Sequence, residues 1–358
     1  MKIEGVLVDL TKLITIKALA DSLLKRRQTL DAVIWNAGVA GWLRTNYLKG
    51  TWDILTDLVH ATTYPEFMIP IPGLLAAPQR SSREIPKKTQ TREAEEPKLG
   101  QVFLANVFGH YMLTHWLAPL FTPSSRIIWI SSTSALPIYF NVDDIQGLQS
   151  RAAYEASKRL TDLIALTSEL PSTRTYVRDF LAVPSQQPIS EGNPAQLPKM
   201  YLTHPGVIGT AIADLPWFLN FFMIAAMYLA RWLSSPWHPV DPYKGAISAV
   251  FAALSPPSQL PSLEEHDGKG KWGSATGVYG DERVARTEVE GWGYCGVVGE
   301  MPAGSVTTSL WRHRTEMTME GREEFEEEGR TVWKQMEGLR REWEGRLGEV
   351  DARSAEDV

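Results

Sequence analysis

The stretch Arg126-Ile127-Ile128-Trp129-Ile130-Ser131-Ser132 predicts a strand that is buried on both faces and ends in two hydroxyl side chains. Two other runs have the same form. Residues 30–38 are apolar and finish in an Asn-Ala-Gly turn, and residues 201–207 break at Pro-Gly. Short buried strands separated by helical segments predict an α/β fold with a parallel sheet. In such sheets ligands bind beyond the carboxyl ends of the strands, so the residues that follow each run become site candidates.

The second informative stretch is Tyr154-Glu155-Ala156-Ser157-Lys158, which lies between the second and third of these strands. A spacing of four residues places the phenol and the ammonium on one face of a helix, one turn apart. A free tyrosine has a pKa near ~10, and a neighbouring lysine charge favours the phenolate and lowers that pKa. The pair could then protonate an oxyanion. The alternative is an amphipathic surface turn, because this spacing occurs by chance on many helices.

Taken in order, these residues resemble the short-chain dehydrogenase/reductase family. Within it, the chain is most similar to the fungal 3-ketosteroid reductases of sterol biosynthesis. The family marks are Asp9, the turn Asn36-Ala37-Gly38, Asn106 on a helix, a serine at a strand end, the pair Tyr154 and Lys158, and Pro205-Gly206. The narrower resemblance lies in residues 140–148, 154–162, 270–276 and 286–293. The family match covers roughly the first 255 residues, and the narrower match extends almost to the end.

The resemblance implies a Rossmann-type doubly wound parallel sheet and a set of site residues. Ser131, Ser132 and Ser134 all follow the central strand, but strand alternation sends Ser131 and Ser132 to opposite faces. In the steroid reductases the second serine of this pair is the match, so Ser132 is expected to hold the substrate ketone. Tyr154 would then supply the proton, Lys158 would lower the pKa of the tyrosine and bind the cofactor ribose, and Asn106 would hold a relay water.

The same resemblance implies NADP(H) as the cofactor. The direction of the family's reaction favours NADPH, since the residue that would read the ribose 2′ position lies in a segment that this chain lacks. The residues expected at the cofactor are Asp9, Asn36, Ala37, Gly38, Tyr154, Lys158, Pro205, Gly206, Val207 and Thr210.

The implied reaction is reduction of the C3 ketone of 4-methyl sterol intermediates during C4 demethylation. Other C4-demethylation enzymes are expected partners, and the endoplasmic reticulum membrane or a lipid droplet is the expected location. Two alternatives stay open, because catalytic residues do not specify a substrate. One is a non-catalytic scaffold in a sterol-enzyme complex, and the other is a reductase of another lipid ketone or a retinoid.

The expected glycine-rich opening is missing from this sequence. A nicotinamide fold begins with a strand, a glycine-rich turn and a helix whose amino terminus holds the pyrophosphate. Residues 4–9 resemble the third strand of the family instead, so the first two strands and the glycine-rich loop have no counterpart. The strand at residues 4–9 would then float or pair in an unusual way and leave an open sheet edge. We expect an amino-terminal truncation and weakened dinucleotide binding.

Composition fits an enzyme of this kind and excludes several other classes. The chain has 358 residues, 44% hydrophobic residues and a net charge of -6, so a nucleic-acid partner is not expected. Its single cysteine, Cys295, excludes an intrachain disulfide. The seven histidines show no metal-ligand spacing, and no metal is expected. The start of the chain lacks the pattern of a secretory signal.

The sequence divides into a truncated reductase domain at residues 1–255 and an appendage at 256–358. Helices are expected over residues 11–28 and 101–120, and a variable insertion over 40–100 whose polar part, 80–98, would be a solvated loop or a cover beside the substrate.

Two further segments stand out for their apolar side chains. Residues 216–233 are strongly apolar but shorter than the ~20 residues of a spanning helix, so they are expected to lie at a membrane surface or to form a lid over the substrate. Residues 261–304 are expected to form a loop. Residues 320–347 predict a long helix whose apolar stripe faces the core or a partner helix.

Overall fold

A mostly parallel sheet forms the centre of the computed structural model, which describes residues 2–79, 96–182, 197–210, 215–306 and 317–356. Within these residues the main sheet has six strands in the order β1-β4-β5-β6-β7-β8. The first four run parallel, β7 is antiparallel to β6, and β8 is parallel to β7. This arrangement confirms the expected α/β, Rossmann-like architecture. The strands are β1 (Ala32–Trp35), β4 (Arg126–Ile130), β5 (Lys199–His204), β6 (Lys271–Thr276), β7 (Glu282–Thr287) and β8 (Ser305–Val306).

Helices cover both faces of this sheet, because its central strands are apolar on both sides. Every residue of β4 is buried. Ile127 and Trp129 contribute to a large core on one face, whereas Ile128 and Ile130 pack into a smaller core on the other. The larger core is covered by α1 (Leu13–Arg26), α4 (Gln101–Phe103), α5 (Gly109–Trp116), α6 (Ala153–Thr167), α7 (Arg174–Phe180) and α12 (Met319–Glu356); the smaller core lies under α10 (Ile247–Leu254) and α11 (Gln259–Asp267).

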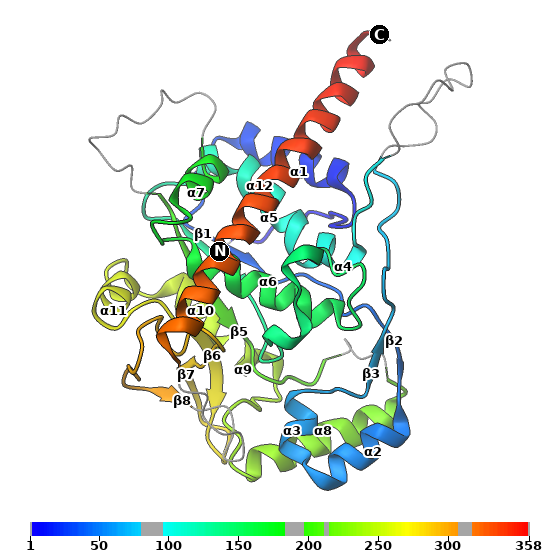
Figure 1. The fold of residues 1–358 in the computed structure, drawn as a ribbon, viewed down its shortest axis with the longest axis vertical. Helices are drawn as coiled ribbons and strands as arrows, with labels where there is room; N and C mark the ends of the chain where they lie inside the picture. Colours follow the sequence, from blue (N-terminus) through cyan, green and yellow to red (C-terminus); the bar gives the residue numbers. More distant parts are fainter. Residues whose placement is uncertain (1, 80–95, 183–196, 211–214, 307–316, 357–358) are drawn as a thin grey trace.

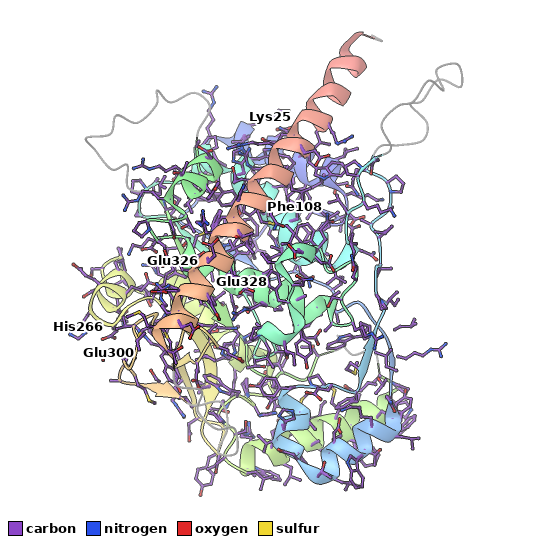
Figure 2. The ribbon with its side chains drawn as sticks, viewed as in Figure 1. Lys25, Phe108, His266, Glu300, Glu326 and Glu328 are labelled. Atoms are coloured by element: carbon purple, nitrogen blue, oxygen red, sulfur yellow. The ribbon has the colours of Figure 1, made fainter. Side chains whose placement is uncertain are left out.

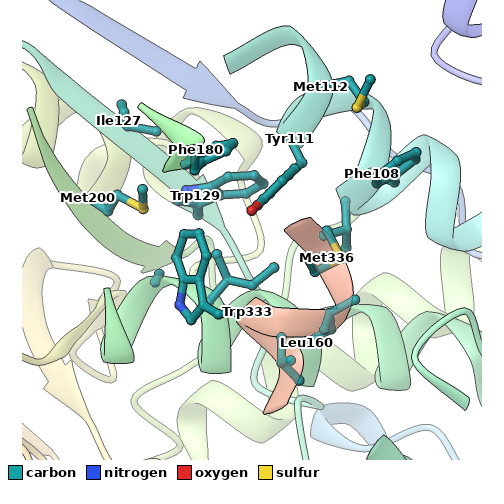
Figure 3. Packing of buried hydrophobic residues seen from close by; sticks show 14 of the residues in the cluster. Phe108, Tyr111, Met112, Ile127, Trp129, Leu160, Phe180, Met200, Trp333 and Met336 are labelled. Carbon is teal, nitrogen blue, oxygen red and sulfur yellow. The ribbon is translucent and has the colours of Figure 1, made fainter. Parts of the chain in front are cut away.

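The carboxyl-terminal helix α12 packs against this larger core (Figure 1). Trp333 of α12 lies against Tyr111 of α5, with ring centroids 5.9 Å apart, and Tyr111 stacks on Phe180 at 4.0 Å (Figure 3). Polar residues of α12 also reach the body of the protein. Glu326 and Glu328, labelled in Figure 2, bind Ser172 and Arg159. The expected long helix with a core-facing stripe is therefore confirmed.

The helix expected over residues 101–120 is interrupted by a short π-helical segment. It consists of α4, the π-helix η1 (Leu104–Phe108), α5 and the 3₁₀ turn η2 (Ala118–Leu120). Such single π-turns often occur at functional positions, and this one carries Asn106. Gly109 follows it in close packing, since a Cβ there would lie 2.9 Å from the Leu104 carbonyl oxygen and 3.0 Å from the Ile16 side chain.

Residues 42–70 form a small separate layer at one end of the molecule. β2 (Trp42–Thr45) and β3 (Met68–Pro70) form a two-stranded antiparallel sheet, and α2 (Tyr47–Thr56) and α3 (Leu58–Thr63) lie between them in the chain. The apolar segment near residue 220 forms α8 (Trp217–Trp232), as expected, and α3 packs against it (Figure 1). The sequence did not predict this layer. Most of the polar part of the insertion, residues 80–95, lies outside the described residues.

Two expectations about secondary structure are wrong. Residues 4–9 form no strand: they pair with no strand of the residues that the structure describes, and Leu7 is fully exposed. Residues 261–304 are not a loop: α11 ends within them, and β6 and β7 extend the central sheet. Their glycines suggested a loop, but Gly273 allows close packing, since a Cβ there would lie 2.2 Å from His204. The remaining short helices are η3 (Pro137–Tyr139), η4 (Val142–Asp144) and α9 (Pro242–Gly245).

Candidate active site

The two serines at the end of β4 point in different directions, as strand alternation requires. The Ser131 hydroxyl donates to the buried carboxylate of Asp162. The Ser132 hydroxyl oxygen lies on the other side, where it accepts a hydrogen bond from the Ser134 backbone N–H at 3.1 Å. Because that bond uses an acceptor site, the proton of the Ser132 hydroxyl is free to be donated. Ser132 also interacts with the Tyr154 hydroxyl, so the structure brings together the two residues that the sequence paired.

Tyr154 and Lys158 lie one turn apart on α6, and the Lys158 ammonium is 5.6 Å from the centre of the tyrosine ring. The ammonium donates to the Ile130 carbonyl oxygen at 2.8 Å. Burial raises the pKa of Tyr154 to about 12, and the hydrogen bond with Ser132 acts in the opposite direction. Burial also lowers the pKa of Lys158 to about 8, with a further contribution from the Lys271 charge.

The pKa of Tyr154 is therefore raised and not lowered, in contrast to what the nearby lysine led us to expect. The Lys158 ammonium is held at the strand end by the Ile130 carbonyl, 5.6 Å from the centre of the tyrosine ring. Desolvation of the phenolate then dominates the pKa of Tyr154. The tyrosine is consequently neutral at pH 7 and carries a proton that it can donate.

Asn106 fixes the turn that follows β1. Its side-chain oxygen accepts from the Val39 N–H at 2.7 Å, and its amide nitrogen donates to the Val39 carbonyl and to the Ser157 hydroxyl, both at 3.0 Å. Gly38 has no side chain to obstruct this contact, since a Cβ there would lie 2.7 Å from the Asn106 oxygen. Both amide hydrogens of Asn106 are thus used within the protein. Its role in holding a relay water stays a prediction.

The turn residues Asn36, Ala37 and Gly38 are exposed after the carboxyl end of β1, where a ligand could reach them. The residues after β5 are placed differently. The Val207 N–H donates to the Trp237 carbonyl at 2.7 Å, and the Thr210 N–H donates to the Ile208 carbonyl.

Other groups of the segment after β5 are also held by the protein itself. A Cβ on Gly206 would lie 2.8 Å from Pro239, and Pro205 precedes this closely packed glycine. Asp9 lies outside the sheet, where its carboxylate accepts from the Thr11 N–H and hydroxyl. These hydrogen bonds lower the pKa of Asp9 and stabilise the turn that precedes α1.

Three residues at the site were not predicted. The Trp42 ring, on β2, lies edge-on to the Tyr154 ring with centroids 5.5 Å apart. Asp162 and Lys271 form a buried ion pair at the end of β4. The spacing of Asp162, four residues beyond Lys158, was a signal that could have placed it on the same helical face. No comparable signal placed Trp42 or Lys271, because both reach the site only through the tertiary fold.

One end of a nicotinamide cofactor fits these residues better than the other. Tyr154, Lys158 and the exposed turn at residues 36–38 suit the nicotinamide and ribose end. The pyrophosphate end lacks a comparable cradle within the described ranges. At the amino terminus of the first helix, α1, the Leu13 N–H is already used, since it donates to the Gln79 side chain at 2.7 Å.

The arrangement as a whole can polarise and protonate a carbonyl oxygen. Ser132 and Tyr154 present two hydroxyl donors beside each other, and Lys158 places a cation behind the tyrosine ring. Donors held in advance toward a developing oxyanion are a major source of catalysis. No group of three or more His, Cys, Asp or Glu side chains that could hold a metal ion occurs in the part of the chain that the structure describes.

Known proteins with similar sequences are named for one shared function. No family model matches the chain. The 3-keto-steroid reductase erg27 of Aspergillus fumigatus is 41% identical over 368 residues, covering 98% of this chain and 79% of that protein. The 3-keto-steroid reductase ERG27 of Gibberella zeae is 36% identical, covering 89% of this chain and 68% of that protein. A short chain dehydrogenase family protein from Francisella tularensis aligns at 12% identity with a TM-score of 0.37, covering 71% of this chain and 76% of that one.

Proposed function

The chain belongs to the fungal 3-keto-steroid reductases, within the short-chain dehydrogenases/reductases, and we propose that it reduces the C3 ketone of 4-methyl sterols to the 3-hydroxysterol with NADPH. The observation that carries the proposal is the meeting of Ser132, Tyr154 and Lys158 at the carboxyl end of β4. These are residue types that a ketone reductase needs. The 4-methyl sterol and the NADPH preference come from the resemblance in sequence.

In this mechanism the hydroxyls of Ser132 and Tyr154 hydrogen-bond to the ketone oxygen. Bound NADPH would supply a hydride to the carbonyl carbon. The side chains of the protein would donate the proton and stabilise the negative charge on the oxygen. As negative charge develops on the oxygen, Tyr154 transfers its proton and Ser132 holds the oxygen in place. A pKa of about 12 means that Tyr154 is protonated at neutral pH, as a general acid must be.

Lys158 has two functions in the proposal. Its ammonium lies 5.6 Å from the Tyr154 ring and would stabilise the phenolate that remains after proton transfer. Together with the turn at residues 36–38 it would also hold the ribose end of the cofactor. The cation is required in both functions, so the pKa of about 8 limits the proposed activity on the alkaline side.

The proposal extends to contact with a lipid surface. None of the helices within the described residues is both long and apolar enough to cross a bilayer. However, α8 and α2 expose large apolar side chains, among them Trp217 at 84%, Phe221 at 65%, Leu48 at 88% and Trp52 at 69%. Tryptophan is favoured at the headgroup boundary, where a sterol could pass between the bilayer and the protein.

A vesicle-binding measurement tests this extension. We expect the protein to float with phosphatidylcholine vesicles, and we expect the double variant Trp52→Gln/Phe221→Gln to remain in the aqueous fraction. Ile138→Gln is the matched control, because Ile138 is 82% exposed on η3, outside these two helices. Equal flotation of both variants would contradict the membrane role.

Two expectations about cellular context belong to the same proposal. They are partners among the other sterol C4-demethylation enzymes, and a location at the endoplasmic reticulum membrane or the lipid droplet. Both rest on the resemblance. A fluorescent fusion that colocalises with neither compartment would contradict the proposed location.

The reaction is tested by incubating the purified protein with NADPH and a 4-methyl-3-ketosterol and detecting the 3-hydroxysterol by mass spectrometry. The Aspergillus fumigatus relative serves as the positive control. Turnover that is lost in Tyr154→Phe would support the proposal. A folded protein that does not act on sterols but reduces another lipid ketone would support the alternative substrate. A folded protein with no reductase activity would favour the scaffold.

A further inference from the structure

Three buried charged side chains form hydrogen bonds with three consecutive residues at the end of β4. The Lys158 ammonium binds the Ile130 carbonyl at 2.8 Å, and the Asp162 carboxylate accepts from the Ser131 hydroxyl. The Lys271 ammonium binds the Ser132 carbonyl at 2.7 Å. Each residue of the strand end is thus bound by a different charged group. The last of them is the serine that faces Tyr154.

Asp162 and Lys271 link these contacts through an ion pair of 2.7 Å. The side chain of Asp162 is fully buried and that of Lys271 is 3% exposed. Burial raises the pKa of Asp162 and lowers that of Lys271, and the attraction between the two charges acts against both shifts. Buried ion pairs are often no more stabilising than well-packed apolar residues of similar size. A contribution to folding stability therefore does not by itself explain why this ion pair lies at the end of β4.

We propose that the Asp162–Lys271 ion pair is a positioning element that fixes Ser132 and balances the charge around Lys158. This inference rests on the proposed reductase function. Asp162 and Lys271 lie in residues 154–162 and 270–276, two of the stretches that resemble the steroid reductases. The proposed reaction itself uses only Tyr154 and Lys158 of these stretches. Neither residue is placed in contact with the substrate. They act through the serine and the lysine.

The charges around Lys158 give the two partners opposite electrostatic effects. On its own helix Lys158 is near Tyr154 and Asp162; from β6 it meets Lys271, and from α5 it meets His110. His110 has its pKa lowered to about 4 and is neutral at pH 7. The Lys271 charge lowers the pKa of Lys158, whereas the Asp162 charge raises it. Removing one partner therefore moves this pKa in the opposite direction from removing the other.

This opposition provides a test that general destabilisation cannot imitate. In Lys271→Met the alkaline limb of kcat/KM should move up by about one pH unit, and in Asp162→Asn it should move down by about one. Both variants should lose about 10- to 100-fold in kcat, with little change in KM, because Ser132 is no longer held in line. Lys271→Arg keeps the positive charge, so its alkaline limb should stay in place.

A matched control is the pair of Glu337 and Arg340, which is also buried but lies within α12. Glu337→Gln and Arg340→Met should leave the position of the alkaline limb unchanged. Shifts in the same direction for Lys271→Met and Asp162→Asn, or no shift in either, would overturn the inference. If Lys271→Met does not fold, Asp162→Asn and Lys271→Arg still give different expectations: the alkaline limb should move down in the first and stay in place in the second.

A second readout separates this inference from the proposed function. The pKa of Lys158 can be followed without substrate by NMR of protein labelled with ¹³C at the lysine Cε, assigned by the signal that Lys158→Arg removes. An inactive wild type whose Lys158 pKa moves in opposite directions in the two variants would contradict the reductase function but support the charge balance. An active wild type with no such shifts would support the function and overturn the charge balance.

Discussion

The end of β4 and the outer edge of β1 are neighbours in one sheet, yet they are built in different ways. All five residues of β4 are buried, and buried charged groups hold the serines that follow it. β1 pairs only with β4 among the described strands, and its Ile34 is 41% exposed. The turn at residues 36–39 beyond it is exposed and is held by Asn106.

This difference separates the proposed chemistry from the proposed cofactor binding. Proton donors must be fixed before the reaction, and the β4 side supplies burial and charge for that purpose. The β1 side offers an exposed backbone edge, and the turn that follows β1 is bound by the Asn106 side chain. We therefore expect changes at β4 to damage the site strongly and changes at β1 to have smaller effects.

The largest effect should follow from removing the acid at the β4 side. Tyr154→Phe leaves the ring beside Trp42 but removes the hydroxyl, so kcat should fall about 10²- to 10⁴-fold. Steady-state kinetics of ketosterol reduction would measure the loss. Unchanged thermal unfolding would show that the fold is intact. A loss of less than tenfold would mean that another group supplies the proton.

A matched pair of core substitutions tests the comparison directly. Ile34 of β1 and Ile128 of β4 are register partners of the same residue type, and they differ in exposure, 41% against 0%. Ile128→Ala should lower the free energy of unfolding by about 3 kcal/mol, and Ile34→Ala by about 1 kcal/mol or less. Urea denaturation measures both. Equal losses would show that the β1 edge is as well packed as the centre.

The pH dependence of the wild type provides a third prediction. Because the pKa of Lys158 is lowered to about 8, its ammonium is present below that pH and is lost as the pH rises through it. kcat/KM should therefore fall about tenfold per pH unit above about 8. Tyr154, with a pKa of about 12, stays protonated over this range. A profile that is flat up to pH 10 would remove Lys158 from the mechanism.

The smallest effect should come from the turn after β1. In Gly38→Ala the new Cβ would lie 2.7 Å from the Asn106 oxygen, so the turn or the amide must shift. A loss of about 1 kcal/mol in the free energy of unfolding is expected. The control is Gly5→Ala, because a Cβ at Gly5 has no atom within 4 Å. If the two variants are equally stable, the hydrogen bonds between Asn106 and the Val39 backbone contribute nothing to the free energy of unfolding.

The local patterns of this sequence were sufficient to predict the central sheet. The buried runs around Ile128 and Tyr201 became β4 and β5, and the spacing of Tyr154 and Lys158 placed them together on α6. Alternation along the strand also separated Ser131 from Ser132 correctly. Each of these inferences uses neighbours in the chain, where the period of the backbone fixes which side chains share a face.

What depends on distant contacts could not be predicted in this way. Lys271 reaches the site from β6, and Trp42 reaches it from a layer whose fold no local pattern indicated. The pKa of Tyr154 was expected to fall, because the sequence shows a nearby lysine but not the burial that outweighs it. Residues 4–9 resemble a strand in sequence, yet they form none and pair with no strand in the described part of the chain.

A reduction with labelled cofactor tests the proposed reductase activity directly. The protein would be incubated with a 4-methyl-3-ketosterol and NADPH that carries deuterium at the transferred position of the nicotinamide, and the sterol analysed by mass spectrometry. We expect a 3-hydroxysterol with one deuterium at C3 from the wild type and almost none from Tyr154→Phe. Unreduced ketosterol from a folded wild type, in an assay where the Aspergillus fumigatus relative is active, would contradict this expectation.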